Sequence, residues 1–471
     1  MTKLEFPFKS FPAIMSGYMS TDTLMLSISG LRGWIGQSLT PPIAARYAGA
    51  VGSWLKATSG KAHPHIVVGR DSRPSGEMIQ QAALAGLTAV GCRVTTLGIV
   101  TTPGTAIMVE HLHADAGMVI TASHNPVDWN GIKTLQHDGI APPPAQARQI
   151  IDRFRNEQLD YVPVDQLQPV THDDTTHRVH IDRILKHIDV PAIRRAKLAV
   201  VLDSVHGAGG PSAAMLLKEL GVTNLHRYAE PTGLFPHSPE PTAENLITLC
   251  DAVKGAKAHL GFAQDPDADR LALVDENGRY IGEEYTLALC AAHLMTRAPG
   301  PAAANLSTSR MIDDIAAAHG QIVHRTPVGE ANVANTMRER RCVVGGEGNG
   351  GIMWPPVVYV RDSLVGIALL LEMLAKSGKS LSQLVAAIPR YAIVKDKLPI
   401  QPGMADRTIA NLKKAFAGQR IDLQDGIRID WPGKWVHVRP SNTEPILRII
   451  AEAPDEKSAR DLIGQMRKHL G

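Results

Sequence analysis

The sequence predicts an α/β protein built from several domains, and three observations lead to this expectation. Its 471 residues exceed what one hydrophobic core usually organises, and typical domain sizes suggest three or four units. Short β-branched runs alternate with longer amphipathic segments, which is typical of α/β layers with largely parallel sheets. Pro, Gly and polar residues also cluster at three places that divide the chain into four segments: between Asp160 and Asp174, near Gly278–Glu284 and near Ser377–Asp396.

The individual elements can be assigned in chain order. Strands that end in polar loops alternate with helices in the first part of the chain, while strands followed by one helix close it. We expect strands at 65–71, 92–98, 116–122, 196–205 and 258–265, with helices at 77–91 and 211–221. A hairpin is expected at 271–282, then strands around 426–438 and 446–453 and a helix at 458–470.

These elements give a domain plan. Residues 1–23 are predicted to be an N-terminal extension, followed by four domains at 24–165, 166–280, 281–385 and 386–471. The first three could be distant copies of one α/β design, whereas the last is a small α+β unit.

The composition narrows the class of partners. A net charge of only +3 argues against nucleic acid as the main partner, because nucleic-acid-binding proteins need a clustered basic face. The four cysteines form no C-x-x-C pair, which fits a reducing cytoplasm. The N-terminus lacks the continuous apolar core of a signal peptide, and no run approaches the roughly 20 apolar residues of a membrane span. We therefore expect a cytoplasmic protein with neither a membrane nor a nucleic acid as partner.

The first chemical motif is T-A-S-H-N-P at 121–126, directly after an expected strand. Loops at strand C-termini usually hold ligands in open α/β sheets, and a serine there can act as a nucleophile or phosphate carrier. Ser123 is the candidate, with His124 and the nearby Lys133 able to steady negative charge. In isolation an Asn-Pro turn with an incidental hydroxyl remains the simpler interpretation.

The second motif is D-P-D-A-D-R at 265–270, again at a strand end. Alternate positions of an extended loop project to one side, so Asp265, Asp267 and Asp269 could converge on one hard cation such as Mg²⁺. Arg270 beside the ion could clamp a phosphate. A solvated acidic turn is the alternative. An EF-hand is excluded because Arg270 occupies the position that requires glycine.

The third motif is G-G-E-G-N-G-G at 345–351. Its glycines let the backbone approach a ligand closely, while Glu347 and Asn349 offer the polar groups that sugar hydroxyls require. A mobile surface turn would look similar.

The fourth motif is R-P-S-N-T-E-P at 439–445, flanked by expected strands. Arginines, hydroxyls, an amide and exposed N–H groups could form a non-covalent phosphate cradle, although an ordinary polar hairpin loop has the same composition. The candidate phosphate ligands are Arg439, Ser441, Asn442, Thr443 and Arg448. Arg32 in S-G-L-R-G is a lesser candidate near the start of the chain, and no P-loop motif supports ATP use.

Together these four motifs resemble, in the same order, the phosphoserine, metal, sugar and phosphate loops of the α-D-phosphohexomutase superfamily. The resemblance extends over nearly the whole chain from about Leu24. It implies three similar mixed-sheet α/β domains and a C-terminal α+β domain resembling the TATA-binding-protein fold, arranged around a central cleft.

The resemblance also implies an activity, a phosphohexose mutase that interconverts hexose 6- and 1-phosphates. Ser123 would carry phosphate and, with Asp265, Asp267 and Asp269, would hold Mg²⁺. A hexose 1,6-bisphosphate would be the bound intermediate and activator, and the loop at Arg439 would accept either phosphate in turn. Arg32, His124 and Lys133 match positions near the reacting groups, with acid–base roles implied for them.

The sugar is less clearly indicated. The G-E-G-N-G-G loop and the S-I-S-G-L-R-G segment resemble a branch often assigned to phosphoglucosamine mutase, so glucosamine phosphate is favoured over glucose or mannose phosphates. Glu330 stands where some relatives place a sugar-binding histidine. A metal-dependent sugar phosphatase and a non-enzymatic sugar-phosphate-binding protein are the other interpretations, and the protein is expected to be a monomer or a homodimer.

Overall fold

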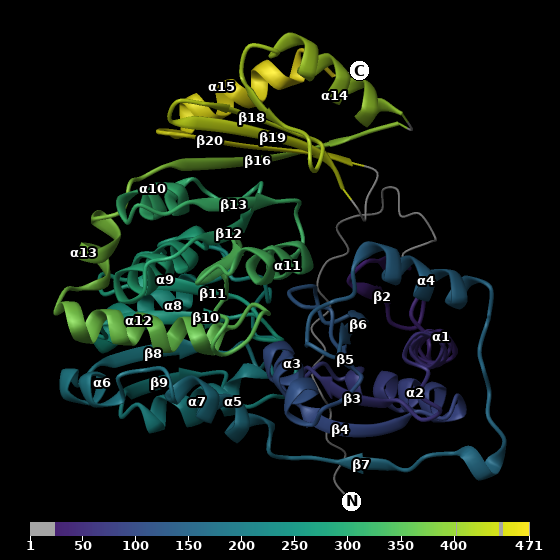
Figure 1. Ribbon diagram of the computed structural model, residues 1–471. Coiled ribbons are helices and arrows are strands. Elements are labelled where there is room, and N and C mark those ends of the chain that lie inside the picture. The colour runs from purple at the N-terminus through teal and green to yellow at the C-terminus, as the bar shows by residue number, and fades with distance from the viewer. Residues whose placement is uncertain (1–23, 402, 442–445, 471) are drawn as a thin grey trace, which may run out of the picture.

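The computed structural model describes residues 24–401, 403–441 and 446–470, and it contains four separate β-sheets (Figure 1). The predicted extension at 1–23 and the candidate phosphate ligands Asn442 and Thr443 lie outside the described residues. No helix within those ranges combines the length and apolar character needed to cross a membrane.

The first sheet has seven strands in the order β1-β2-β6-β5-β3-β4-β7. Strands β3, β4, β5 and β7 run parallel, while β1, β2 and β6 add antiparallel pairs. The predicted boundary at 165 and 166 lies before β7, which still pairs with β4 of this sheet. Its elements are β1 Met25–Ser27, β2 Gly30–Trp34, α1 Pro41–Ser59, β3 His65–Arg70, α2 Gly76–Ala89, β4 Arg93–Ile99, α3 Thr102–His111, β5 Ala116–Ile120, β6 Trp129–Gln136, α4 Pro144–Arg155 and β7 Val170–His172.

The second and third sheets have four strands each, in the orders β11-β10-β8-β9 and β13-β12-β14-β15. The second domain contains α5 Thr176–Leu185, α6 Val190–Ala196, β8 Ala199–Asp203, α7 Gly209–Glu219, β9 Thr223–Arg227, α8 Ile247–Ala256, β10 Leu260–Gln264 and β11 Leu271–Asp275. The third contains α9 Glu284–Arg297, β12 Ala302–Asn305, α10 Met311–Ala318, β13 Val323–Thr326, α11 Glu330–Arg340, β14 Val344–Glu347, β15 Gly351–Met353, α12 Ser363–Ser377 and α13 Leu381–Ala386.

One four-strand pattern recurs in all three sheets. Its first strand pairs in parallel with its second and third strands, and its fourth strand pairs antiparallel with its third. The pattern comprises β3 to β6, β8 to β11 and β12 to β15. The expected similarity of the three α/β domains is therefore confirmed at the level of strand order and direction.

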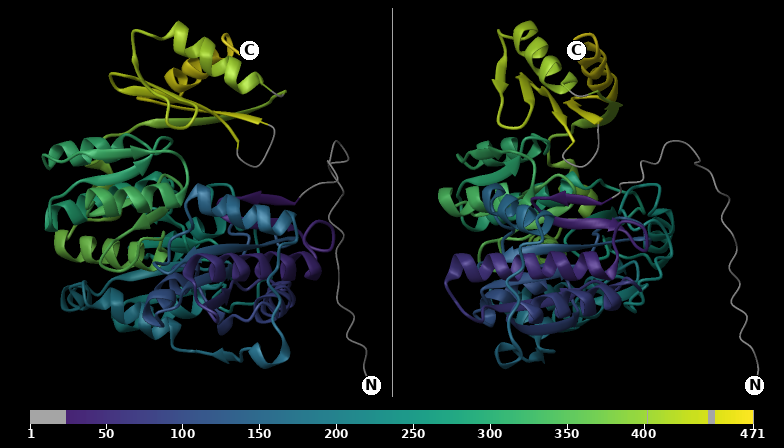
Figure 2. Two further views of the ribbon diagram at one scale, coloured as in Figure 1. Left: turned by 45° about the vertical axis from the view of Figure 1, so that its right-hand side comes forward. Right: turned by 90° about the vertical axis from the view of Figure 1, so that its right-hand side faces the viewer.

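The C-terminal domain has a different design, an antiparallel five-stranded sheet in the order β16-β20-β19-β18-β17. It forms one end of the molecule in Figure 1 and Figure 2, with both of its helices on one side of the sheet. Its elements are β16 Ala392–Pro399, α14 Met404–Ala415, β17 Arg420–Asp422, β18 Ile427–Trp431, β19 Lys434–Pro440, β20 Ile446–Ala453 and α15 Glu456–Arg467.

The core is not divided equally among the domains. One apolar cluster contains Leu202 and Phe262 of the second domain together with Leu289 and Leu369 of the third, all fully buried. The first and fourth domains each have a cluster of their own. The cluster shared by the second and third domains also contains Ile107 and Val119 of the first domain, so apolar packing is continuous from the first domain through the second to the third.

Candidate active site

The first three motifs occupy the same place in the repeated strand pattern. Each lies in the loop between the third strand, which is parallel to its neighbour, and the antiparallel fourth strand: β5–β6 for Ser123, β10–β11 for the three aspartates and β14–β15 for Glu347. The repeat thus presents three equivalent loops. At least two of them are in direct contact: Ser123 Oγ lies 3.1 Å from Asp265 Oδ2, although the two residues are 142 positions apart in the sequence.

Ser123 is held in a conformation that a residue with a side chain rarely adopts. Its φ of 52° lies in the left-handed region, which costs about 1 kcal/mol or more for a residue other than glycine. The Thr121 hydroxyl accepts a hydrogen bond from Ser123 N at 2.9 Å, and Arg73 Nη2 donates to the Ser123 carbonyl at 2.7 Å. Asp71 pairs with the buried Arg73 and accepts from the Thr121 hydroxyl at 2.6 Å. This network holds the backbone of Ser123 in place.

The three aspartates are completely buried, and their carboxylates approach one another to within 4.8 Å. At least one oxygen of each accepts a hydrogen bond from the protein, and Asp265 uses both. Asp265 Oδ1 accepts from the backbone N–H groups of Asp269 and Arg270, both at 3.1 Å. Asp267 Oδ2 accepts from Thr102 Oγ1 and Lys133 Nζ, each at 2.6 Å.

The remaining oxygens fit a cation. Oδ1 of Asp267 and Oδ1 of Asp269 are buried and have no hydrogen-bond partner among the described residues. Burial, followed by the charges of Asp267 and Asp269, raises the pKa of Asp265 well above its usual value. A divalent ion with oxygen ligands would satisfy these two unpartnered oxygens. It would also supply positive charge beside Asp265. The residues present therefore fit a metal ion.

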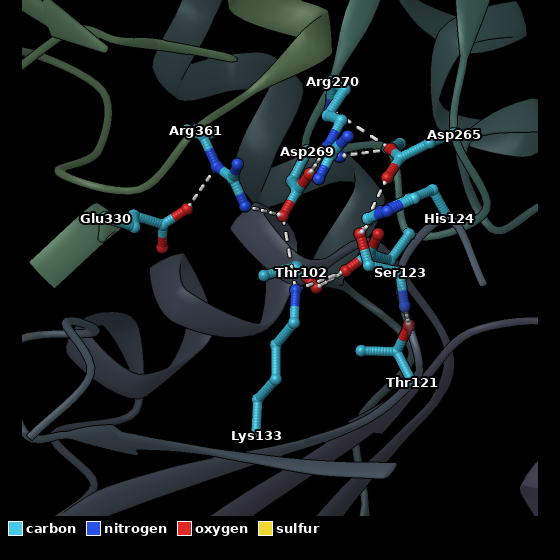
Figure 3. A network of polar contacts seen from close by, with 12 residues as sticks. Thr102, Thr121, Ser123, His124, Lys133, Asp265, Asp269, Arg270, Glu330 and Arg361 are labelled. Atoms are coloured by element: carbon cyan, nitrogen blue, oxygen red, sulfur yellow. Dashed lines mark hydrogen bonds and ion pairs between the residues drawn. The ribbon is translucent and has the colours of Figure 1, made fainter. Parts of the chain in front are cut away.

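One positively charged side chain from each neighbouring domain pairs with Asp269. Its Oδ2 lies 3.2 Å from Lys133 Nζ of the first domain and 2.7 Å from Arg361 Nη2 of the third (Figure 3). Burial would lower the pKa of Lys133, but the charges of Asp267 and Asp269 outweigh it and raise that pKa. Lys133 thus stays protonated, and its contribution here is positive charge.

His124 and Arg32 border the Ser123 hydroxyl. His124 Nδ1 lies 3.3 Å from Ser123 Oγ, and Arg32 Nη1 donates to Asn125 Oδ1 at 2.9 Å. Burial, reinforced by the charges of Arg270 and Arg32, lowers the pKa of His124 to about 2, so its ring is neutral at pH 7. A neutral imidazole can accept one hydrogen bond and donate another.

In the sugar loop, both oxygens of Glu347 are occupied by protein groups. Oε1 accepts from Asn305 Nδ2 at 2.8 Å and from Gly329 N at 3.2 Å, while Oε2 lies 3.0 Å from Arg361 Nη1. The Asn349 amide is within 3.5 Å of Glu347 Oε2, and Asn349 Oδ1 is buried without a partner among the described residues.

Arg361 connects the sugar loop to the metal loop. Each of its three nitrogens faces one carboxylate: Nη2 faces Asp269, Nη1 faces Glu347 and Nε faces Glu330 at 2.6 Å. The arm of Arg361 lies directly over Gly351, because a β-carbon built on that glycine would be 2.6 Å from Arg361 Cγ. The last glycine of the G-E-G-N-G-G loop therefore leaves room for this arginine.

The fourth loop is linked to the same region by Asp425. Its Oδ2 accepts from Arg439 Nε at 2.8 Å and from Val328 N at 3.0 Å. Arg439 and Arg448 are directly opposite each other on β19 and β20. Two arginine side chains therefore start from one cross-strand position beside the fourth loop. Ser441 N donates to Ile446 O at 2.9 Å, beside the undescribed residues of the loop.

Several side chains of this site belong to none of the four sequence motifs: Asp71, Arg73, Thr102, Asn305 and Arg361. Asp71 and Asn305 stand at the end of the first strand of their repeats, so the rule that pointed to the other strand-end loops could have found them. Thr102 and Arg361 carry no comparable signal, because Asp267 and Asp269, their partners, belong to another domain.

Comparison with known families agrees with this architecture over almost the whole described chain. Four models of the phosphoglucomutase/phosphomannomutase family match in order: alpha/beta/alpha domain I at 25–160, domain II at 178–278, domain III at 283–391 and the C-terminal domain at 393–469. Fold and family together place the chain in the class of the phosphosugar mutases, which are enzymes. The chain belongs to the phosphoglucomutase/phosphomannomutase family, within the α-D-phosphohexomutase superfamily.

Individual relatives carry two kinds of name. The phosphoglucomutase/phosphomannomutase of Thermococcus kodakarensis is 38% identical over 438 residues, covering 92% of this chain and 95% of its own. The probable phosphoglucosamine mutase of Methanopyrus kandleri is 38% identical over 440 residues, with the same coverage. Among solved structures, a phosphoglucomutase/phosphomannomutase family protein from Burkholderia thailandensis aligns with a TM-score of 0.81 and 28% identity, covering 94% of this chain and 97% of its own.

Proposed function

We propose that this protein interconverts hexose 6-phosphate and hexose 1-phosphate through a phosphorylated Ser123 and a bound hexose 1,6-bisphosphate, with glucosamine phosphate as the favoured sugar. The observation that carries the proposal is the 3.1 Å approach of Ser123 Oγ to Asp265 Oδ2, beside the unpartnered oxygens of Asp267 and Asp269. A phosphate carrier next to a cation-binding group is the minimum equipment for reversible phosphoryl transfer.

Asp265, Asp267 and Asp269 would hold the metal together with the phosphate on Ser123, and oxygen ligands of this kind favour Mg²⁺. A bound Mg²⁺ would neutralise the charge that spreads over the transferring phosphate. Lys133 adds a permanent positive charge on the same side, and the Ser123 loop is already rigid. The chain's own contribution is thus alignment and charge compensation.

The proposed phosphoryl transfer takes place in two symmetrical steps. A free hydroxyl of the sugar phosphate forms a bond to phosphorus as the Ser123 Oγ–P bond breaks, and its proton leaves to a neighbouring base. After the bisphosphate reorients, its other phosphate returns to Ser123 Oγ, and the departing sugar oxygen regains a proton. We assign His124 Nδ1, 3.3 Å from Ser123 Oγ, to hydrogen-bonding the Ser123 oxygen, because a ring whose pKa is lowered to about 2 is too weak a base to take the proton of a hydroxyl group. Arg32 and Arg270 would contact the phosphate at the reacting end.

The opposite end of the substrate would be held by the fourth loop. Arg439 and Arg448 are paired across β19 and β20, and Ser441 follows β19, so this loop can offer positive charge to whichever phosphate is not reacting. Asn442 and Thr443 belong to the same proposed cradle. Glu347 and Asn349 are assigned to the sugar-binding side of the site.

The test combines product analysis with protein mass. Purified protein with Mg²⁺ and a bisphosphate activator is assayed side by side on glucosamine, glucose and mannose 6-phosphates, and intact-mass spectrometry measures phosphate on the protein. We expect isomerised 1-phosphate, a phosphorylated fraction, and loss of both in Ser123→Ala but not in Ser377→Ala on the distant helix α12. Near-normal turnover in Ser123→Ala would refute the proposal that Ser123 carries the phosphate. Stoichiometric inorganic phosphate without isomerised sugar would favour a sugar phosphatase.

The same assay identifies which sugar phosphate the enzyme prefers. The name of the Thermococcus relative favours glucose and mannose phosphates, whereas that of the Methanopyrus relative favours glucosamine phosphate. A higher kcat/KM for glucose or mannose phosphate would replace glucosamine in the proposal and leave the mutase reaction in place.

A further inference from the structure

Two carboxylates lie beside the sugar loop, and they differ in what they can still bind. Glu347 is fully engaged: Asn305 and Gly329 contact one oxygen and Arg361 contacts the other. Glu347 therefore has less free hydrogen-bonding capacity for a ligand than a carboxylate with one open oxygen.

Glu330 is the first residue of α11, and it keeps one oxygen open. Its Oε2 is paired with Arg361 Nε at 2.6 Å, whereas Oε1 has no hydrogen-bond partner among the described residues. The Glu330 side chain is 20% exposed, so the open oxygen is reachable from solvent. Figure 3 shows its carboxylate beside Arg361, on the side of the network opposite Ser123.

The charges around Glu330 favour a positive ligand. Arg361 is a single cation facing three carboxylates, those of Asp269, Glu330 and Glu347. Burial raises the pKa of Glu330, the charges of Arg361 and Lys133 oppose this, and the charges of Asp269 and Glu347 add to the increase. Because Glu330 shares Arg361 with two other carboxylates, its open oxygen can still attract a cationic group of the substrate.

We propose that Glu330 determines the sugar specificity of this enzyme, its free Oε1 accepting a hydrogen bond from the protonated 2-amino group of a hexosamine phosphate. Arg361 is then a positioning residue, because it holds the other oxygen and so aims Oε1. This inference rests on the proposed mutase function and assigns a cause to its preference for glucosamine phosphate.

Physical chemistry sets the direction of the preference. A hydrogen bond between an ammonium group and a carboxylate is roughly twice as strong as one between neutral groups. A 2-hydroxyl group could still donate to Glu330, so hydroxyl sugars remain substrates, but they gain less. A sugar with no donor at carbon 2 leaves Oε1 of Glu330 without a partner and is the poorest of the three.

The experiment measures kcat/KM for glucosamine 6-phosphate, glucose 6-phosphate and 2-deoxyglucose 6-phosphate with native enzyme, Glu330→Gln and Glu339→Gln. Glu339 is an exposed residue of the same helix, so its variant removes the same charge at a distance from the site. We expect native enzyme and Glu339→Gln to prefer the amino sugar over the hydroxyl sugar. In Glu330→Gln that ratio should fall by roughly 10- to 100-fold, mainly through KM for the amino sugar.

The outcomes separate this inference from the function it rests on. An equal loss on all three sugars in Glu330→Gln would show that Glu330 only supports the fold and would overturn the assignment. Loss of the preference in Glu347→Gln but not in Glu330→Gln would assign specificity to Glu347. Should Glu330→Gln not fold, the native series decides alone, since similar kcat/KM for amino, hydroxyl and deoxy sugars contradicts the proposal. No isomerised product from any sugar would instead refute the mutase function.

Discussion

Gly351→Ala is the most direct test of how the sugar and metal loops are joined, because it moves Arg361 without changing any charge. A β-carbon at residue 351 would lie 2.6 Å from Arg361 Cγ and 3.2 Å from Arg361 Cβ, and Cδ would be closer still. The clash involves most of the arm, so the guanidinium must leave its place. Backbone strain does not contribute, because Gly351 is not among the glycines with positive φ.

The expected cost follows from the contacts that the guanidinium makes. Displacing Arg361 leaves Asp269, Glu330 and Glu347 without their shared counter-ion, and removing one partner from a buried ion pair typically costs about 3–5 kcal/mol. Part of this appears as lower thermal stability and part as poorer alignment of the substrate. We expect kcat/KM to fall between about 10- and 1000-fold, and Mn²⁺ affinity measured without sugar to weaken as well.

The matched control is Gly464→Ala, in helix α15 of the C-terminal domain. No atom lies within 4 Å of a β-carbon built there, and replacing a helical glycine by alanine should stabilise the helix by about 0.5–1 kcal/mol. Thermal unfolding followed by fluorescence, steady-state kinetics and Mn²⁺ titration are compared for both variants. Native kcat/KM together with native Mn²⁺ affinity in Gly351→Ala would refute the role given to Arg361.

Two further predictions concern buried polar groups. In Thr102→Val, Asp267 Oδ2 loses a 2.6 Å hydrogen bond from another domain, so Mn²⁺ affinity should weaken roughly 10-fold; an unchanged Kd would contradict this. Glu372 has its pKa lowered to about 2: burial alone would raise it, but hydrogen bonds from His293 and Asp189 N and the charge of Arg297 prevail. A depressed carboxyl pKa stabilises the fold above pH 4.5, here by up to about 3 kcal/mol, and this contribution disappears as the pH falls towards 2. The Tm of native protein should thus exceed that of Glu372→Gln at pH 7, and the difference should narrow below pH 4.5. A difference in Tm that stays constant with pH would contradict the stabilising role given to the Glu372 carboxylate.

Local sequence was sufficient for the features that depend on strand ends. The runs that lead to the loops at residues 121–126 and 265–270 read as buried strands, and a polar loop at the end of such a strand is exposed to a ligand. Ser123 and the three aspartates could be named on that basis. Their contact could not, because a separation of 142 residues carries no geometric information until two domains pack together.

Side chains that serve the site from other domains were beyond the reach of the sequence. Arg361 precedes the N-cap of α12 and reads as an ordinary helix-flanking arginine, yet it faces three carboxylates. For Glu347, residue type and position predicted a sugar contact, and the folded chain adds protein partners to both of its oxygens. Hydrogen-bond occupancy depends on tertiary neighbours, so sequence gives the presence of a carboxylate but not its availability.

The metal loop illustrates why three domains are needed for one site. Three completely buried carboxylates within 4.8 Å of one another would repel strongly in a single isolated domain. Lys133 of the first domain and Arg361 of the third both pair with Asp269, while Thr102 of the first domain binds Asp267. Each neighbour therefore supplies part of the compensation that the loop lacks. The electrostatics that prepare the site for a cation also favour the assembled arrangement of the domains, so metal affinity and domain packing should be weakened by the same substitutions.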